Sequence, residues 1–253
     1  RMERYKAQYW SQHIAGSTQQ SAIKAGKEYR MEERTVGEYT VAASETARIH
    51  PLRPIPKRPS GAGPNQIDLS GVYNAAFNEA WQPVDGLEAL GQDLLVFPAG
   101  LYACDGLLFD ARGVIQLRSS HPDRSRFPDR VRVPVGRRFG RIHVLHSTAH
   151  PERDGAPVGV YELLYADGHK QQVEILYGDD VRDWWFSRDP RLMEEGSQVA
   201  WTGPRRSASS QTDTVRLFKT TYANPRPEAE VVCVDFISGM TQSAPFLLAM
   251  TIE

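Results

Sequence analysis

The segment between residues 179 and 185 gathers the most chemically useful side chains of this 253-residue chain, in the order Asp-Asp-Val-Arg-Asp-Trp-Trp. An indole ring can cover the C–H face of a sugar while charged groups bind its hydroxyls. Neighbouring residues of a strand point to opposite faces, so only one of Trp184 and Trp185 would join such a platform. The alternative, which we favour, is that one tryptophan fills the core and the charged residues pair locally.

A glycan site would draw on aromatic and polar side chains from several parts of the chain. The candidate ligand contacts are Trp81, His146, Arg182, Trp185 and Tyr222. Large aromatic residues pack more often than they bind, and Trp201, inside an apolar run, is expected in the core.

The three aspartates of the same segment suggest a second chemistry. Asp179, Asp180 and Asp183 could hold a structural Ca²⁺ ion, which takes about six to eight oxygen ligands. Three acids around Arg182 are also typical of a salt-bridged loop, and calcium is not the favoured hypothesis. No other cofactor is expected.

Three histidines raise the question of zinc. His143 and His146 are an odd number of residues apart, so on a strand they face opposite ways. Only His146 and His150 share a parity, and the pattern supplies no third protein ligand, which zinc requires. We therefore expect these histidines in the core or at its rim.

Residues 118–141 hold eight arginines and two aspartates. Such a stripe could contact phosphate or an anionic glycan. However, Arg130 and Arg132 alternate with valines, as on the outward face of a half-buried strand, and the whole chain has a net charge of −1. A nucleic-acid partner is not expected.

No sequence motif for catalysis is present, whether a nucleophile elbow, a phosphate loop, a metalloprotease helix or a cysteine–histidine pattern. We therefore expect a protein that is not an enzyme. The composition, with 40% hydrophobic and 24% charged residues, is ordinary for a globular protein.

The elements that would position these residues are short apolar runs separated by turn residues. The runs are Ile67–Tyr73, Leu94–Phe97, Gly106–Phe109, Val114–Leu117, Val131–Val135, Arg141–His146, Gly159–Tyr165, Gln171–Tyr177, Val199–Trp201, Val215–Thr220, Val231–Ile237 and Phe246–Ile252. Asp167-Gly168 between two of them is a strong hairpin signal. Many short strands without intervening amphipathic helices predict an all-β chain folded as an antiparallel β-sandwich or jelly roll.

Three zones divide the chain. Residues 1–50 form a polar, partly helical arm with helix-like spacing over Met2–His13, residues 51–65 a proline-rich linker, and residues 66–253 the sandwich domain. Cys104 and Cys233 permit one disulfide, although the apolar run around Cys233 favours a buried free thiol. The sequence has no apolar run of membrane-spanning length.

Residues 66–253 resemble the galactose-binding-like, or carbohydrate-binding-module-like, β-sandwich domain of many bacterial proteins. The resemblance is carried by Ile67-Asp68-Leu69-Ser70, Tyr73-Asn74, Trp81, Phe109–Leu117, Val135–Arg138, Ile142–His146, Tyr165–Gly168, Tyr177–Trp185, Ala200–Gly203, Asn224–Pro227 and Ala244–Phe246. Ala111 departs from the β-branched residue expected there. The resemblance implies a jelly-roll fold and binding or attachment, and it brings no catalytic residues.

Two hypotheses about function follow. The first is a non-catalytic carbohydrate-binding-like module of a bacterial cell-envelope or secreted protein, with a glycan as its ligand. The second is a structural or interaction subunit of a larger envelope or membrane assembly, bound to a partner protein through the 1–50 arm, whose aromatic residues a free tail would not usefully expose. A sensor module of a membrane-anchored regulator is a third, weaker hypothesis. We expect a location on the periplasmic or extracellular side, with any anchor in a segment outside this sequence.

Overall fold

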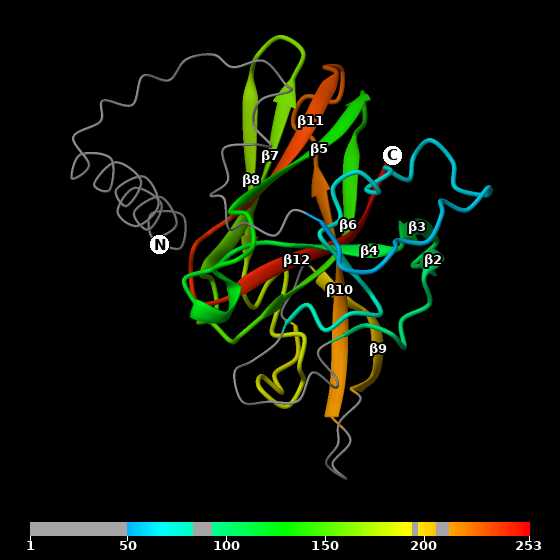
Figure 1. Ribbon diagram of the computed structural model, residues 1–253. Helices are drawn as coiled ribbons and strands as arrows, with labels where there is room; N and C mark the ends of the chain where they lie inside the picture. The colour runs from blue at the N-terminus through cyan, green and yellow to red at the C-terminus, as the bar shows by residue number, and fades with distance from the viewer. Residues whose placement is uncertain (1–49, 83–92, 194–196, 206–212) are drawn as a thin grey trace. The chain divides into compact units, whose positions relative to one another are not determined.

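The computed structural model describes residues 50–82, 93–193, 197–205 and 213–253 (Figure 1). These residues form an all-β fold of antiparallel sheets. Their only helical element is a 3₁₀ turn, η2 (Pro122–Arg124). The helical segments predicted for the arm lie outside the described residues.

Two sheets and one hairpin make up the fold. The larger sheet has the order β1 (Ala75–Ala76), β4 (Gly113–Gln116), β12 (Ala244–Ile252), β6 (Arg141–Ala149), β10 (Asp213–Ala223) and β9 (Ser197–Arg205). The smaller sheet has the order β5 (Arg130–Arg137), β11 (Val231–Ser238), β7 (Pro157–Tyr165) and β8 (Lys170–Leu176). Its four strands stand together in Figure 1. The hairpin consists of β2 (Gly100–Cys104) and β3 (Leu107–Ala111).

The central strands β12 and β6 of the larger sheet are buried on both faces. One face, with Val144 of β6 and Leu247 of β12, shares a core with Tyr161 and Phe236 of the smaller sheet. The next residue along β6, Leu145, belongs to a second core on the opposite face. Every residue of β12 is therefore buried, and its sequence lacks the alternation of a half-exposed strand.

The β7–β8 hairpin confirms the prediction from Asp167-Gly168. The strands pair in antiparallel register up to Leu164 opposite Lys170. Gly168 has a φ of 84°, in the left-handed region where glycine carries no steric cost. The turn chemistry thus sets this register locally.

Two of the predicted strands, Ile67–Tyr73 and Leu94–Phe97, are wrong. In both segments a preceding or internal aspartate turns the chain: Asp68 Oδ1 accepts a hydrogen bond from the Ser70 amide, and Asp93 Oδ1 accepts one from the Leu95 amide, each at 3.0 Å. Such side-chain hydrogen bonds compete with strand pairing. The apolar residues of these segments fill the cores from loops instead.

The proline-rich segment 51–65 packs on the sandwich. Ile55 contacts the first core, and the Arg58 guanidinium lies 3.2 Å from the buried Asp110 carboxylate. A Cβ added at Gly113 of β4 would lie 2.7 Å from Ile55 Cδ1, 2.8 Å from Tyr73 Cγ and 3.0 Å from the backbone oxygen of Ala75, so this crowded position favours glycine. Prolines keep the segment out of helices and sheets, while its side chains still bind it to β3 and β4.

Candidate functional site

The predicted tryptophan contacts lie in the second core. Trp81 and Trp184 are fully buried, with ring centroids 5.4 Å apart, and Trp185 is 5% exposed. The Trp81 indole donates a hydrogen bond to Gln116 Oε1 at 3.1 Å. These rings cover the larger sheet instead of forming a surface platform.

Both neighbouring tryptophans point into the same core, contrary to the alternation expected of a strand. The segment has no continuous ladder here: Asp183 bridges to Thr148, and Trp185 bridges to Val215 on another strand. The indoles of Trp184 and Trp185 consequently lie 6.0 Å apart. The Arg188 guanidinium stacks 3.6 Å over the Trp185 ring and covers its outer side.

His146 and Tyr222, two further predicted contacts, belong to one cluster inside the first core. His146 Nδ1 lies 3.1 Å from the Tyr161 hydroxyl, and its Nε2 lies 2.8 Å from Thr220 Oγ1. Tyr161 packs against Tyr222 at a centroid distance of 5.8 Å. Burial lowers the pKa of His146 to about 3, so the ring is neutral and serves as a hydrogen-bonding core residue.

Arg182, the fifth predicted contact, is a buried structural cation. It donates to Asp154 Oδ1 at 2.9 Å and to Asp189 Oδ2 at 3.2 Å. Asp189 also accepts from the Tyr177 hydroxyl at 2.6 Å. Burial favours a higher pKa for Asp189, but hydrogen bonds from Arg191, Tyr177 and Arg182 outweigh it and hold the pKa below its usual range. This network fixes the loop that follows β8.

The three candidate calcium ligands do not converge. Asp180 Oδ2 accepts from the Leu176 amide at 2.7 Å, whereas Asp183 Oδ1 accepts from the Trp185 amide at 2.9 Å. Asp179 is only partly buried. Within the described ranges, no group of three histidine, cysteine or acidic residues could hold a metal ion. Burial raises the pKa of Asp183 to about 6, against the weaker opposing effects of the Trp185 amide and Arg188.

The histidines, arginines and cysteines have structural environments. His143 Nδ1 lies 2.8 Å from Thr221 Oγ1, and the His150 ring stacks on His121 at 3.9 Å, so the three histidines do not meet. Val131 and Val133 of β5 contact the first core, and the alternating Arg130 and Arg132 both pair with Asp235, at 3.0 Å and 2.7 Å. Both cysteines are free, and Cys233 is buried as expected.

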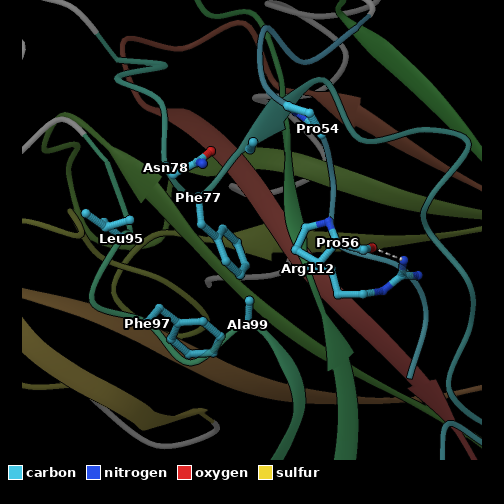
Figure 2. Close-up of a pocket in the computed structure, with 9 residues that line it drawn as sticks. Pro54, Pro56, Phe77, Asn78, Leu95, Phe97, Ala99 and Arg112 are labelled. Atoms are coloured by element: carbon cyan, nitrogen blue, oxygen red, sulfur yellow. Dashed lines mark hydrogen bonds between the residues drawn. The ribbon is translucent and has the colours of Figure 1, made fainter. Parts of the chain in front are cut away.

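One hollow, of about 190 Å³, opens beside the proline-rich segment (Figure 2). Figure 2 shows the rings of Phe77 and Phe97 on one side and Pro56 opposite them. Asn78 and Leu95 lie at the exposed rim. The lining residues are Pro54, Pro56, Ala76, Phe77, Asn78, Leu95, Phe97, Ala99 and Arg112. The hollow is therefore mostly apolar, with one amide and one guanidinium in its wall.

Arg112 is part of the wall of the hollow and ties the proline-rich segment to β3. Its guanidinium donates to Pro56 O at 2.9 Å, to Asp110 Oδ1 at 2.7 Å and to Asp68 Oδ1 at 2.6 Å. It also donates to the Ser70 hydroxyl at 2.7 Å. Because these partners occupy its donors, Arg112 shapes the wall without presenting an unpaired charge to a ligand.

Several exposed apolar side chains stand on the segments that also supply lining residues of this hollow, or on the adjoining β2–β3 hairpin. Leu52 is 78% exposed and Leu95 is 50% exposed. Val96 follows Leu95, and Leu101 lies on the outward face of the β2–β3 hairpin with Leu108, which is also exposed. We call the hollow and these exposed residues the docking face. Exposed large apolar side chains beside a hollow are a feature of contact sites in soluble proteins.

Sequence reasoning missed the docking face. Its signal was the run Leu94-Leu95-Val96-Phe97, which is more apolar than a strand with one exposed face requires. The Phe97 amide donates to Leu94 O at 2.9 Å, so the run makes a tight turn. Leu94 and Phe97 then point into the core, and Leu95 and Val96 point out.

The comparisons with known proteins add no family. No protein-family model matches the chain, and no significant match to a curated protein was found. In the described ranges, no helix has the length and apolar character needed to cross a bilayer. The site geometry thus carries the functional argument.

Proposed function

We propose that residues 50–253 form a non-catalytic interaction module that binds a partner protein through the docking face. The observation that carries this proposal is the pairing of a ready-made apolar hollow with exposed apolar side chains at Leu52, Leu95, Val96 and Leu101. Interfaces concentrate their binding energy where an anchor side chain fills a desolvated pocket. Apolar residues around such a pocket exclude water from the contact.

Glycan binding stays the competing hypothesis. Trp81 and Trp185, the rings expected to stack on a sugar, are buried in the second core. A glycan would therefore need the hollow between Pro56, Phe77 and Phe97, which offers Asn78 as its polar rim residue. A sugar has many hydroxyls to satisfy, and this mostly apolar wall favours a protein side chain instead.

We also propose a jelly-roll topology and a cellular location for this module. The order β4-β12-β6-β10 in one sheet and β5-β11-β7-β8 in the other supports an eight-strand jelly roll. Two added strands, β1 and β9, extend the larger sheet, and the β2–β3 hairpin stands apart. This topology is compatible with the galactose-binding-like resemblance. We propose a bacterial cell-envelope setting from that resemblance alone.

Site-specific photocrosslinking tests the proposal in the full chain. A photoreactive phenylalanine analogue at Leu95, expressed in the native host, should give a discrete protein adduct, and the same analogue at exposed Arg137 on β5 should not. A second substitution, Leu101→Asp, should remove the Leu95 adduct while the urea unfolding midpoint stays unchanged. Absence of an adduct at Leu95, or equal adducts at both positions, would refute the proposal.

A glycan array on the full chain distinguishes glycan binding from binding of a partner protein. If the docking face binds a partner protein, no glycan should bind the chain in a way that depends on this face. If a glycan binds the chain and Leu95→Asp abolishes that binding, the hollow is a sugar site, and the protein-partner proposal fails.

A further inference from the structure

We propose that the chain pairs with a second copy of itself through the free edge of β8, in an antiparallel arrangement whose two-fold axis passes through Gln172. This contact is separate from the docking face and goes beyond the proposed function. It joins the smaller sheets of the two copies into one continuous sheet. The direction of the β8 backbone groups, the protection of the other sheet edges and the order of charges along β8 support it.

β8 is an edge strand whose outward backbone groups follow from its register. It pairs with β7 at the outer side of the smaller sheet (Figure 1). The Tyr165 amide donates to His169 O at 2.9 Å, so the residues next to the turn form a hydrogen-bonded pair. Such pairs alternate with non-hydrogen-bonded pairs along an antiparallel ladder. Gln171 and Val173 therefore direct their backbone groups to β7. The residues that direct theirs to the free edge are Lys170, Gln172 and Glu174.

Leu176, the next residue of this alternation, supports the assignment and marks where the open edge ends. Its amide donates to Asp180 Oδ2 at 2.7 Å, and its carbonyl oxygen accepts from the Asp180 amide at 2.8 Å. At Gln172 the described residues supply one such contact, from the Gln171 side chain to Gln172 O at 3.1 Å. The Gln171 side chain is exposed and can turn into solvent. A second strand can therefore reach the edge over residues 170–174.

The other edges of the two described sheets carry features that discourage pairing. β5 contains Pro134 and a register shift against β11, and Gly136 has a φ of 62°. β9 contains Pro204, and its Ala200 carbonyl accepts a hydrogen bond from the Tyr102 hydroxyl at 2.7 Å. β1 has two residues. Prolines, bulges and short strands protect sheet edges, whereas β8 has none of these features between residues 170 and 174.

The charges of β8 are self-complementary about Gln172. Residues 170–174 read Lys-Gln-Gln-Val-Glu. A two-fold axis through Gln172 places Lys170 opposite Glu174 of the second copy and repeats this pair on the other side of the axis. The two side chains lie on the same face of the strand, and opposite charges directly across a ladder stabilise it. The Lys170 side chain is 54% exposed and lies 3.6 Å from Glu162, so it can contact a second carboxylate as well.

This register also satisfies the outward backbone groups. Gln172 faces its own copy, and each facing pair exchanges both of its N–H···O=C bonds. An edge lysine ordinarily discourages pairing, because a foreign strand leaves its charge unmatched. Lys170 thereby selects a strand with a carboxylate at the matching position. Contacts that bury less than about 1,200 Å² are mostly transient, so we expect a weak dimer that forms at high protein concentration.

Sedimentation velocity on the full chain tests the proposal. The unmodified chain should shift from monomer to dimer as its concentration rises. Gln172→Pro removes the central outward N–H and should abolish the dimer, whereas the control Gln172→Ala keeps that N–H and should still dimerise. The urea unfolding midpoint of each variant shows whether the fold is kept. A monomer at every concentration, or an equal dimer from folded Gln172→Pro, would overturn the proposal.

Charge reversal tests the register without a proline. Lys170→Glu and Glu174→Lys each place like charges opposite each other on both sides of the axis. Each variant alone should therefore self-associate roughly tenfold more weakly. An equimolar mixture of the two variants should form a heterodimer with the affinity of the unmodified chain, because every glutamate then faces a lysine. Single variants that dimerise normally, or a mixture that associates no better than they do, would exclude this pairing.

Hydrogen exchange locates the contact on the strand. The Gln172 amide should exchange rapidly in dilute solution and slowly in concentrated solution, while the Leu176 amide, bonded to Asp180, should be protected in both. A dimer that forms without protecting Gln172 would place the contact elsewhere and refute the proposal. Leu95→Asp, in the docking face, should leave self-association unchanged. The β8 contact and the interaction module can therefore fail independently.

Discussion

Replacing Arg112 with methionine should destabilise the fold by about 3 kcal/mol. The side chains of Arg112 and Asp110 are 2% and 0% exposed, and their Nε and Oδ1 atoms lie 2.7 Å apart. Breaking a buried pair by removing one partner costs about 3–5 kcal/mol, since the remaining charge stays buried. Arg58, 3.2 Å from Asp110, still compensates part of that charge, which places the expected cost at the lower limit.

The contact with Asp68 adds little to this figure. The Asp68 side chain is 48% exposed, and exposed ion pairs contribute about 0–1 kcal/mol. Methionine keeps the unbranched apolar stem of Arg112, so lost packing is small. The loss of the hydrogen bond to Pro56 O should loosen the proline-rich segment and the hollow that it borders.

Urea unfolding of the full chain, followed by tryptophan fluorescence, measures the effect. With a slope of about 2–3 kcal/mol per molar urea, the midpoint should fall by roughly 1–1.5 M. The control Arg137→Met removes an exposed arginine and should change stability by less than about 0.5 kcal/mol. The double variant Asp110→Asn/Arg112→Met should recover most of the loss, because no charge is left unpaired. Equal midpoints for Arg112→Met and Arg137→Met, or strict additivity in the double variant, would refute the reasoning.

Three further changes probe the buried site residues by the same unfolding assay. Trp81→Ala should cost about 3–5 kcal/mol, because it empties the second core, whereas a surface sugar platform would leave the midpoint unchanged. The pKa of Asp183 is raised to about 6, so its protonated form favours folding below pH 4, and the protein loses about 3 kcal/mol of stability as the pH rises through 6. Asp183→Asn should remove this slope of stability between pH 4 and 7. An unchanged slope would contradict the assignment. The pKa of His146 is lowered to about 3, so its neutral form favours folding above about pH 6.5, and this contribution to stability is lost as the pH falls toward 3. His146→Gln should therefore flatten the acid side of the curve of stability against pH. A curve as steep as that of the unmodified chain would exclude His146 as the source of the slope.

The strands were predictable where local chemistry decides them. The β7–β8 hairpin follows from a turn that needs positive φ at Gly168 and from flanking runs of β-branched and aromatic residues. The segments 67–73 and 94–97 have equally apolar compositions, but aspartate side chains turn them at Ser70 and Leu95. An apolar run thus predicts burial more reliably than it predicts pairing with a neighbouring strand.

The burial of the candidate site residues was harder to predict, because it depends on a second core that the sequence pattern does not reveal. A sandwich with one core would expose the outer face of β6 and β12, and a tryptophan there could serve a ligand. In this fold loops carrying Trp81, Trp184 and Trp185 cover that face. The burial of these rings depends on contacts between residues far apart in the chain, which periodicity cannot reveal.

The position of the docking face follows from the same arrangement. Loops cover the outer face of the larger sheet, and the outer face of the smaller sheet carries paired charges such as Arg132 with Asp235. The loops that supply the second core must return to the surface, and the turn at residues 94–97 does so with Leu95 and Val96 outward. Exposed apolar residues cost solubility and persist where a contact uses them. The proline-rich segment is held by a hydrogen bond from Arg112 and not by strand pairing. It borders the turn at residues 94–97 and leaves the hollow open. The structure that buries the predicted sugar contacts thereby also creates the surface on which we propose that a partner binds.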